Sequence, residues 1–306
     1  MNPRVSIIVP IKNKVTFLSR ALTSVSLACA EHGAAEIVLI ENGSTDGSRE
    51  LAQSFEGTAS VLYSSASTIS AVRNAGARHA QGDLLVFLDS DIVVPTNYLA
   101  MVEVVIGSTP ADAVGYPVRP PDDGTWVEWQ WYLLNVAERS GVTHFINSGS
   151  IAVTRQAFER ISGFPEDFET GEDYEFCRRL VSTGYQIHRD ERLSVVHLDN
   201  PKTIAAFFRK EVWYGLGMLK ASGEKAMNRP TLMTLAHILL LLICIASALV
   251  NRFLLTFILL NAVPVATLVY RLRIGGRVGN GLQQLLLLHV FYCARIVGLV
   301  RGLRRR

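Results

Sequence analysis

Cysteine is scarce in this chain, and no cysteines form a paired motif. Four of the 306 residues are cysteine, and they lie far apart, at Cys29, Cys177, Cys244 and Cys293. This spacing excludes a disulfide framework and a zinc site, and it favours a reducing compartment. The N-terminal sequence, MNPRVSIIVPIKNK, lacks a long apolar core and a small-residue cleavage site, so it predicts no signal peptide. We therefore expect the globular part to lie in the cytoplasm.

Charged residues are also few, at 19% of the chain, and the net charge is only +3. This balance does not indicate a nucleic-acid partner. No GxGxxG sequence follows the first apolar run, which disfavours a dinucleotide-binding oxidoreductase. The mean hydropathy of +0.25 is high for a soluble protein, and the apolar excess lies within residues 231–300. We predict a catalytic domain over residues 1–228 and a membrane anchor over residues 229–306.

Apolar runs alternate with amphipathic segments along the first part of the chain. Strand-like runs span residues 5–9, 36–40, 60–63 and 84–88, and helical periodicity spans 17–29, 48–55 and 69–79. This alternation predicts an α/β fold with a mostly parallel sheet and right-handed crossovers. Farther along we expect helices at 98–106, 155–161 and 174–183, and strands at 113–118, 145–154, 185–187 and 194–197.

The sequence Asp89-Ser90-Asp91 follows the apolar run at residues 84–88 directly. Ligands of open α/β sheets bind outside the carboxyl ends of the strands, where these carboxylates would lie. Mg²⁺ is usually held by one or two carboxylates together with substrate phosphates. An isolated Asp-x-Asp is more often a solvated turn, so the metal interpretation depends on the rest of the chain.

Two further fragments carry candidate catalytic groups. Glu172 and Asp173 stand at the start of a predicted helix, where acids often serve only as caps. Alternatively, one of them is a general base that accepts a proton from an attacking hydroxyl. His197 ends a predicted strand, where it is either structural or part of a metal site begun by a carboxylate.

Five sequence blocks resemble family 2 glycosyltransferases in their order and approximate spacing. The blocks are VSIIVPIKNK, LIENGSTDGS, RNAGARHAQGDLLVFLDSDIVVP, NSGSIAVTRQAFERISGF and TGEDYEFCRRL. They cover about residues 4–200, and each is weak alone, but five in order are specific. The resemblance implies the GT-A fold, a Rossmann-like α/β domain, and an inverting, metal-dependent sugar transfer from a nucleotide-sugar donor, most often a UDP-sugar.

The resemblance also implies roles for individual residues. Asp91 would bind Mg²⁺ or Mn²⁺, with Asp89 beside the nucleotide and His197 near the metal. Asp173, in its pair with Glu172, would be the general base. The donor would contact six further positions: Pro10, Glu41, Asn42, Arg73, Ser148 and Gly149. Glu41 and Asn42 stand where the family commonly has two Asp residues, so the identity of the base is left open. The QxxRW motif of processive synthases is absent, which disfavours processive synthesis.

Three apolar stretches follow residue 230. Residues 232–250 and 253–270 carry no charge and are long enough to span a bilayer, so they predict a transmembrane helical hairpin. Basic residues flank both ends, which by the positive-inside rule places these ends in the cytoplasm. Residues 282–300 contain polar side chains and precede four arginines. They predict an interfacial amphipathic helix, with a third span as the alternative.

Residues 119–145 are less regular and contain an aromatic cluster, Trp126, Trp129, Trp131 and Tyr132. Core or interface packing is the favoured interpretation, and contact with a sugar or with lipid headgroups is the alternative. Altogether we expect a glycosyltransferase at the inner membrane that acts on a saccharide, most naturally lipid-linked. The alternatives are a polyprenyl-phosphate glycosyltransferase and a non-catalytic membrane-bound scaffold.

Overall fold

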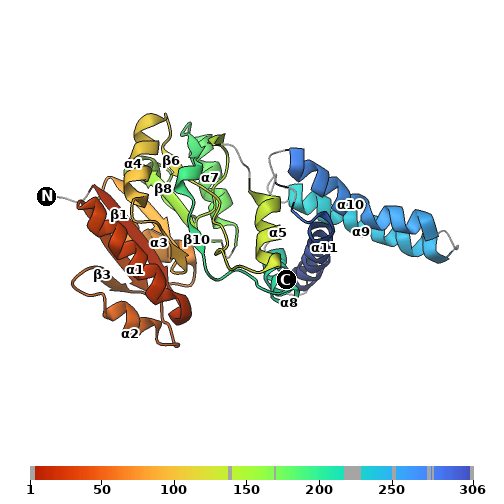
Figure 1. Ribbon diagram of the computed structural model, residues 1–306, viewed down its shortest axis with the longest axis horizontal. Coiled ribbons are helices and arrows are strands. Elements are labelled where there is room, and N and C mark those ends of the chain that lie inside the picture. Colours follow the sequence, from red (N-terminus) through yellow and green to blue (C-terminus); the bar gives the residue numbers. More distant parts are fainter. Residues whose placement is uncertain are drawn as a thin grey trace. The chain divides into compact units, whose positions relative to one another are not determined.

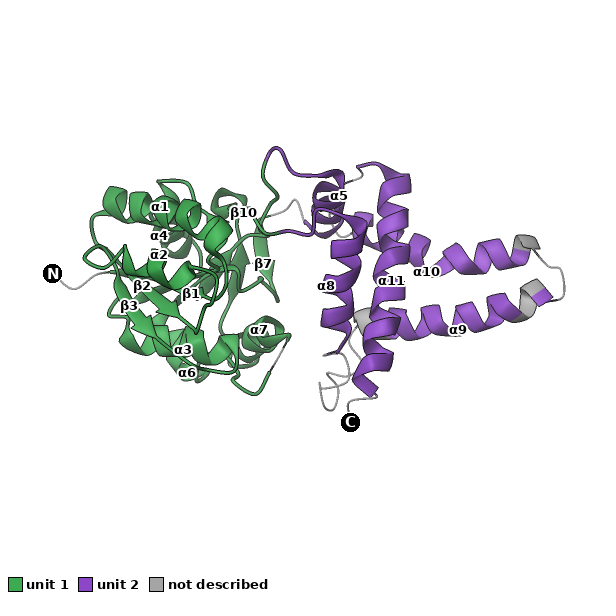
Figure 2. Cartoon of the chain, turned by 90° about the horizontal axis from the view of Figure 1, so that it is seen from below, with its two compact units in different colours: residues 1–121, 139–199 green, residues 122–138, 200–306 purple. Residues whose placement is uncertain are grey.

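The computed structural model describes residues 4–136, 140–168, 170–216, 229–249, 253–273, 277 and 279–303. The chain forms two compact units (Figure 2). Unit 1 comprises residues 1–121 and 139–199, and unit 2 comprises residues 122–138 and 200–306. This division differs from the predicted boundary at residue 228, because residues 122–138 and 200–216 pack with the C-terminal helices.

Unit 1 begins with the predicted alternation of strands and helices (Figure 1). The elements are β1 (Val5–Ile11), α1 (Val15–His32), β2 (Ala35–Glu41), α2 (Ser48–Gln53), β3 (Ser60–Tyr63), α3 (Ile69–His79) and β4 (Leu84–Leu88). Strands β3, β2, β1 and β4 lie in this order and are parallel. All residues of β1 and β4 are buried, which explains why β4 is continuously apolar and why β1 has Ser6 as its one polar residue.

The second half of unit 1 completes a mixed sheet. Its elements are β5 (Ile92–Val93), α4 (Tyr98–Ser108), β6 (Ala113–Gly115), β7 (Gly141–Thr143), β8 (Ser150–Thr154), α6 (Arg155–Arg160), α7 (Glu172–Ser182), β9 (Ile187–Arg189), the 3-10 helix η1 (Glu191–Leu193) and β10 (Val196–His197). The sheet order is β3-β2-β1-β4-β8-β6-β9-β7, and β8 runs antiparallel to both β4 and β6. Strands β5 and β10 form a separate antiparallel pair.

Several predicted boundaries differ from those observed. The strand expected at 145–154 begins only at Ser150, because residues 145–149 form a turn in which Gly149 N donates to Asn147 Oδ1 at 2.8 Å. The strand expected at 185–187 is observed as β9 at residues 187–189. Of the strand expected at 194–197, only residues 196 and 197 pair, as β10. Strands β5 and β7 were not predicted, since elements of two or three residues leave too little periodicity to detect. Helices α5 (Trp126–Asn135) and α8 (Ile204–Leu216) were not predicted either.

The close contact of α3 with the sheet requires glycine at position 76. A Cβ atom there would lie 2.6 Å from side-chain carbons of both Ile8 and Ile40. The core beneath α3 joins residues of β1, β2 and β4 to aromatic side chains from residues 158–176. Phe164, for example, stacks on Phe176 with ring centroids 4.1 Å apart. This packing fixes α3 and the segment that leads into α7 on the same core.

The regular elements among the described residues of unit 2 are all helices. It contains α5 (Trp126–Asn135), α8 (Ile204–Leu216), α9 (Arg229–Leu249), α10 (Phe253–Arg273) and α11 (Gly281–Leu303). Trp131 of α5 packs against Phe207 and Phe291, with ring centroids 4.8 and 5.4 Å away. Part of the aromatic cluster therefore serves core packing.

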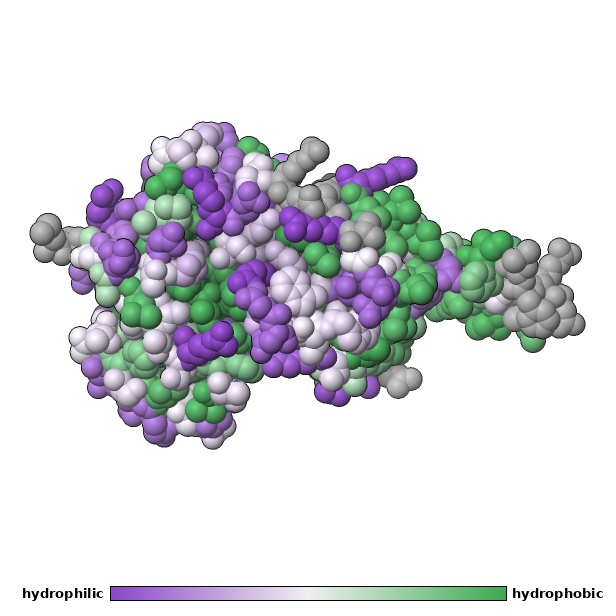
Figure 3. Space-filling view, in the orientation of Figure 1, coloured by the Kyte–Doolittle hydropathy of each residue, from purple (hydrophilic) through white to green (hydrophobic). Residues whose placement is uncertain are grey.

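Helices α9 and α10 form a hairpin, and α8 and α11 lie side by side and crosswise to it (Figure 2). Two described segments, Leu255–Arg273 and Gly281–Leu303, are long and apolar enough to cross a membrane, and Leu232–Ile245 is a shorter apolar helix. Figure 3 shows apolar side chains over the hairpin, where Leu239, Leu242 and Phe257 are exposed.

Helices α8 and α11 touch through their backbones. A Cβ atom on Gly298 would lie 2.3 Å from Val212 O and 2.7 Å from Gly215 Cα. Beside this contact Arg295 forms an ion pair with Glu211 at 2.8 Å and lies over the ring of Tyr214. Small residues permit the close approach, and the ion pair fixes its register.

Candidate active site

The predicted metal ligands meet at the turn after β4. Asp91 is almost fully buried, and its Oδ1 atom lies 3.3 Å from His197 Nε2. The β5–β10 pair brings the two together, because His197 is paired with Ile92 and Leu198 N donates to Asp91 O at 2.9 Å. The structure thus places His197 beside the Asp-x-Asp turn, and its role at a metal stays a prediction.

The ammonium group of Lys14 holds the other oxygen of Asp91. Lys14 Nζ donates to Asp91 Oδ2 at 2.6 Å and to Asp199 Oδ2 at 2.6 Å. Burial alone would raise the pKa of Asp91, but His197 and Lys14 outweigh it and hold this pKa below its usual range. Sequence reasoning assigned no role to Lys14 or Asp199, although both lie in segments that carried other candidates.

The donor set at Asp91 fits a divalent cation that is also bound by substrate. Among the described residues, no group of three His, Cys, Asp or Glu side chains could hold a metal ion by itself. Asp91 Oδ1 is buried and faces His197 Nε2 at 3.3 Å without a well-formed hydrogen bond in the described part of the chain. A carboxylate oxygen and an imidazole nitrogen at this spacing could bind one divalent cation together with substrate phosphates.

Arg73 connects the Asp-x-Asp turn to the predicted base. Its side chain is 3% exposed, and it donates to Asp89 Oδ1 at 2.7 Å and to Glu172 Oε1 at 3.1 Å. The next residue, Asn74, holds the segment before α7 by exchanging hydrogen bonds with the backbone of Phe164. Helix α3 thereby fixes Asp89 and the start of α7 relative to each other.

Asp173 lies in the first turn of α7, beside Glu172. Burial, and then the charge of Glu172, raise the pKa of Asp173 to about 6, against opposing backbone hydrogen bonds and the Arg73 charge. Asn147 Nδ2 donates to Asp173 Oδ2 at 3.4 Å, a contact that the sequence did not reveal. A carboxyl group with such a pKa is ionised at neutral pH and is basic enough to accept a proton.

The remaining predicted donor contacts lie at the same edge of the sheet. Ser148 is buried and donates to Glu172 Oε1 at 3.4 Å. Gly149 allows the turn to approach Asp89, because a Cβ atom there would lie 3.0 Å from Asp89 Oδ2. The carboxyl ends of the strands therefore bring Gly149 close to Asp89 and Ser148 close to Glu172, and their contact with a donor stays a prediction.

Glu41 and Asn42 end β2 next to the end of β1, where Pro10 pairs with Ile40. Glu41 is buried and accepts a hydrogen bond from the backbone N–H of Ser44. Asn42 Nδ2 donates to Ala66 O at 3.0 Å, and its buried Oδ1 atom has no partner among the described residues. An unpaired buried acceptor at a strand end is available to a ligand's N–H group.

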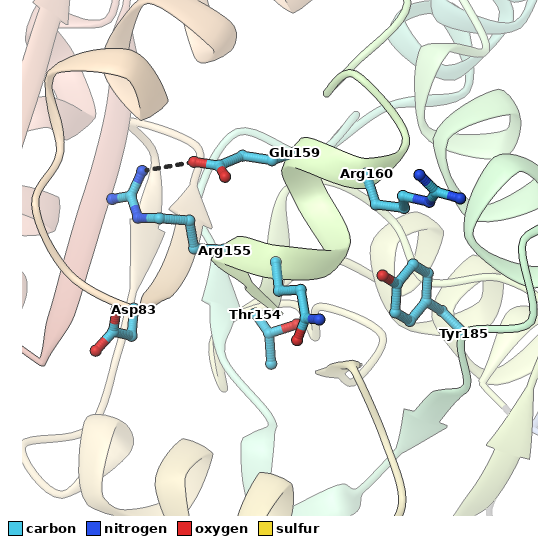
Figure 4. Close-up of a pocket in the computed structure, with 7 residues that line it drawn as sticks. Asp83, Thr154, Arg155, Glu159, Arg160 and Tyr185 are labelled. Atoms are coloured by element: carbon cyan, nitrogen blue, oxygen red, sulfur yellow. Dashed lines mark ion pairs between the residues drawn. The ribbon is translucent and has the colours of Figure 1, made fainter.

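A pocket at the opposite edge of the sheet has no part in this arrangement. It is lined by Asp83, Thr154, Arg155, Gln156, Glu159, Arg160 and Tyr185. In Figure 4, Arg155 faces Glu159, to which it is ion-paired at 3.6 Å, and Arg160 and Tyr185 lie on the other side. Asp83 precedes β4 whereas Asp89 follows it, so the pocket is separated from the candidate site by the length of that strand.

Comparisons with known proteins agree with this geometry. The family model described as glycosyl transferase family 2 matches residues 6–162, and that of the N-terminal domain of galactosyltransferase matches residues 135–200. Among curated proteins, glycosyltransferase AglE of Haloferax volcanii is 25% identical over 60% of this chain. The undecaprenyl-phosphate 4-deoxy-4-formamido-L-arabinose transferase of Pseudomonas aeruginosa is 32% identical over 44% of it.

The chain spans less than two thirds of the length of these relatives, 64% of the first and 41% of the second. Among solved structures, a mannosyltransferase of Pyrobaculum calidifontis in complex with GDP-Man and Mn²⁺ superposes with a TM-score of 0.62. Its sequence is 19% identical, and the match covers 100% of this chain and 88% of that one. At this identity the likeness concerns the fold.

Proposed function

The chain belongs to glycosyl transferase family 2, and on this basis we propose that it transfers a sugar from a nucleotide-sugar donor to a hydroxyl group of a saccharide acceptor. The reaction is a single displacement with inversion. Asp173 accepts the proton of the acceptor hydroxyl while that oxygen attacks the anomeric carbon. The bond from that carbon to the nucleoside diphosphate breaks, and the diphosphate leaves with the bonding electrons.

The observation that carries this proposal is the opposite displacement of two carboxyl pKa values in one site. The pKa of Asp91 is lowered by His197 and Lys14 against the effect of burial, so this group stays ionised. The pKa of Asp173 is raised to about 6 by burial and by Glu172. When their surroundings push the pKa values of two acids in one site apart, the two acids suit different roles. Here Asp91 would stabilise charge and Asp173 would accept the proton.

We also propose that Asp91, with Asp89 and His197, holds Mg²⁺ or Mn²⁺ when the nucleotide sugar is bound. A bound divalent cation supplies positive charge that stabilises the departing diphosphate. The mannosyltransferase with a similar fold binds GDP-Man and Mn²⁺. We further propose that Pro10, Glu41 and Asn42, which lie together at the ends of β1 and β2, contact the nucleoside of a UDP-sugar donor.

A saccharide acceptor is supported by an exposed aromatic ring beside the base. Tyr174 follows Asp173, is 50% exposed and lies 6.4 Å from the ring of Phe145. Exposed aromatic rings stack against the apolar faces of sugars, whereas a bare lipid phosphate offers no such face. A polyprenyl-phosphate acceptor is the alternative, because relatives in Pseudomonas aeruginosa are undecaprenyl-phosphate transferases.

We propose that α9 and α10 anchor the protein in the inner membrane, with unit 1 in the cytoplasm and the acceptor lipid-linked. The crosswise direction of α8 and α11 within unit 2 supports an interfacial position for α11. Arg271 and Arg273 in the last turn of α10, and Arg277 after it, mark the end that the positive-inside rule places in the cytoplasm.

The test is nucleotide release and sugar transfer by the full chain purified in detergent. UDP-, GDP- and dTDP-sugars are supplied with Mg²⁺ or Mn²⁺, and undecaprenyl phosphate is compared with an undecaprenyl-diphosphate-linked sugar. We expect one donor to be used and Asp173→Asn to lower transfer by about 10²-fold or more, the usual contribution of a general base.

Unchanged transfer in Asp173→Asn would contradict the base assignment. Transfer to undecaprenyl phosphate alone would establish the alternative acceptor. If none of the donors binds, the non-catalytic scaffold is the better description.

A further inference from the structure

Lys14 lies between two carboxylates at the proposed cation site. Its Nζ atom is 2.6 Å from Asp91 Oδ2 and 2.6 Å from Asp199 Oδ2. Asp91 is 3% exposed, whereas Asp199 is 45% exposed, so the ammonium group joins a buried acid to one at the surface. Lys14 thus neutralises the carboxylate that is proposed to bind the divalent cation.

Hydrogen bonds fix the backbone of Lys14, so its side chain extends from a defined position. Lys14 N donates to Ser48 Oγ at 2.8 Å, and Lys14 O accepts from the N–H groups of Phe17 and Leu18 at the start of α1. The neighbouring Asn13 is tied to the loop after β2, since Asn13 N donates to Ser44 Oγ at 3.1 Å. The side chain reaches from this fixed loop across the end of β1 to the Asp91 turn.

The other oxygen of the same carboxylate is where a divalent cation would bind. Asp91 Oδ1 is buried and faces His197 Nε2 at 3.3 Å without a well-formed hydrogen bond among the described residues, whereas Oδ2 is held by Lys14. A divalent cation bound to Asp91 would share one carboxylate with the ammonium group. Two positive charges at such close range repel each other strongly where solvent screening is weak.

We propose that Lys14 is a resident counter-cation that competes with the divalent cation for Asp91, and that Asp199 retains the ammonium group when the metal binds. In the absence of substrate, Lys14 balances the negative charge of the buried Asp91 carboxylate. It also lowers the affinity of the unliganded protein for metal, so that the cation is held firmly only together with the diphosphate of the donor. This inference rests on the metal site of the proposed function.

The experiment measures Mn²⁺ binding to the full chain in detergent, without nucleotide, by electron paramagnetic resonance of free Mn²⁺. Lys14→Met removes the charge and keeps much of the side-chain length, and Lys14→Arg keeps the charge. Lys12→Met is the matched control, because Lys12 is exposed in the same loop. We expect Lys14→Met to bind Mn²⁺ about tenfold more tightly or better, and Lys14→Arg and Lys12→Met to stay within about twofold of the wild type.

Lys14→Gln provides a second uncharged variant that can still donate hydrogen bonds, in case the methionine variant does not fold. Thermal unfolding with and without Mn²⁺ checks each variant. The uncharged variants should unfold at a lower temperature without metal and gain more stability from Mn²⁺ than the wild type does. Equal or weaker Mn²⁺ binding by both uncharged variants would overturn the proposal.

Donor hydrolysis by the wild type separates this inference from the proposed function. If the donor is hydrolysed but loss of the Lys14 charge does not tighten Mn²⁺ binding, the competition is refuted and the transferase function stands. If no donor is used and the uncharged variants still bind Mn²⁺ more tightly, the competition stands and the function is refuted.

Discussion

The acid limb of the pH–activity profile should shift to lower pH when the charge of Glu172 is removed. Asp173 must be ionised to accept a proton, so activity should rise with pH through its pKa of about 6. The Glu172 charge raises this pKa and the Arg73 charge lowers it. Glu172→Gln removes the first effect and leaves Arg73 without one of its two partners, so both changes lower the pKa of Asp173.

The size of the shift follows from the charges. Two carboxylates in adjacent residues interact by more than about 1 kcal/mol at an effective dielectric constant of about 20. One pKa unit corresponds to about 1.4 kcal/mol. We therefore expect the midpoint of the acid limb to fall by about one unit, from about 6 to about 5.

The assay is kcat/KM for sugar transfer between about pH 4.5 and 8, because this parameter reports ionisations of the free enzyme. Glu159→Gln is the control, since Glu159 is an exposed acid on α6 that contacts Arg155 rather than Asp173. The reasoning is refuted if the midpoint in Glu172→Gln is unchanged or rises, or if Glu159→Gln produces the same shift.

Two further predictions concern α3. Arg73→Met should lower the free energy of unfolding by about 3 kcal/mol, because it leaves the poorly exposed Glu172 carboxylate without its cationic partner. Urea denaturation would measure this loss. The control is Arg78→Met at an exposed position of the same helix, which should change the free energy of unfolding by less than about 0.5 kcal/mol. Gly76→Ala should cost about 1–3 kcal/mol by overpacking against Ile40. Gly107→Ala, on a helix position with open space around it, should be neutral or stabilising; equal effects of the two glycine changes would contradict the packing argument.

The strands and helices that recur along the chain could be predicted from sequence, and so could most of the site. The runs that became β1, β2 and β4 are mostly apolar because nearly all of their residues are buried. Asp89, Asp91 and Asp173 stand at recognisable element ends. The pairing of Arg73 with both Asp89 and Glu172 could not be predicted, because it depends on how α3 and α7 pack.

The role of Lys14 was missed for a related reason. Its two carboxylate partners belong to distant parts of the chain, and no local pattern connects them. Helix α5 was missed because residues 119–145 lack a regular apolar period, and Trp131 finds its partners only in α8 and α11. In both cases tertiary contacts determine what the side chain does.

The short β5–β10 pair has a consequence for the order of events during synthesis. Strands β1 to β4 can pair as soon as β4 emerges, since β2 and β3 each lie beside the strand made just before them and β4 pairs with β1, which is already present. Asp91 emerges with them, but His197 and Asp199 follow much later and reach it only through β10. Until then Asp91 has only Lys14 to compensate its charge. The nascent chain therefore has a half-assembled sheet and a cation site that is not yet formed. The pairing of β10 with β5 joins distant parts of the chain, and long-range pairing of this kind is slow.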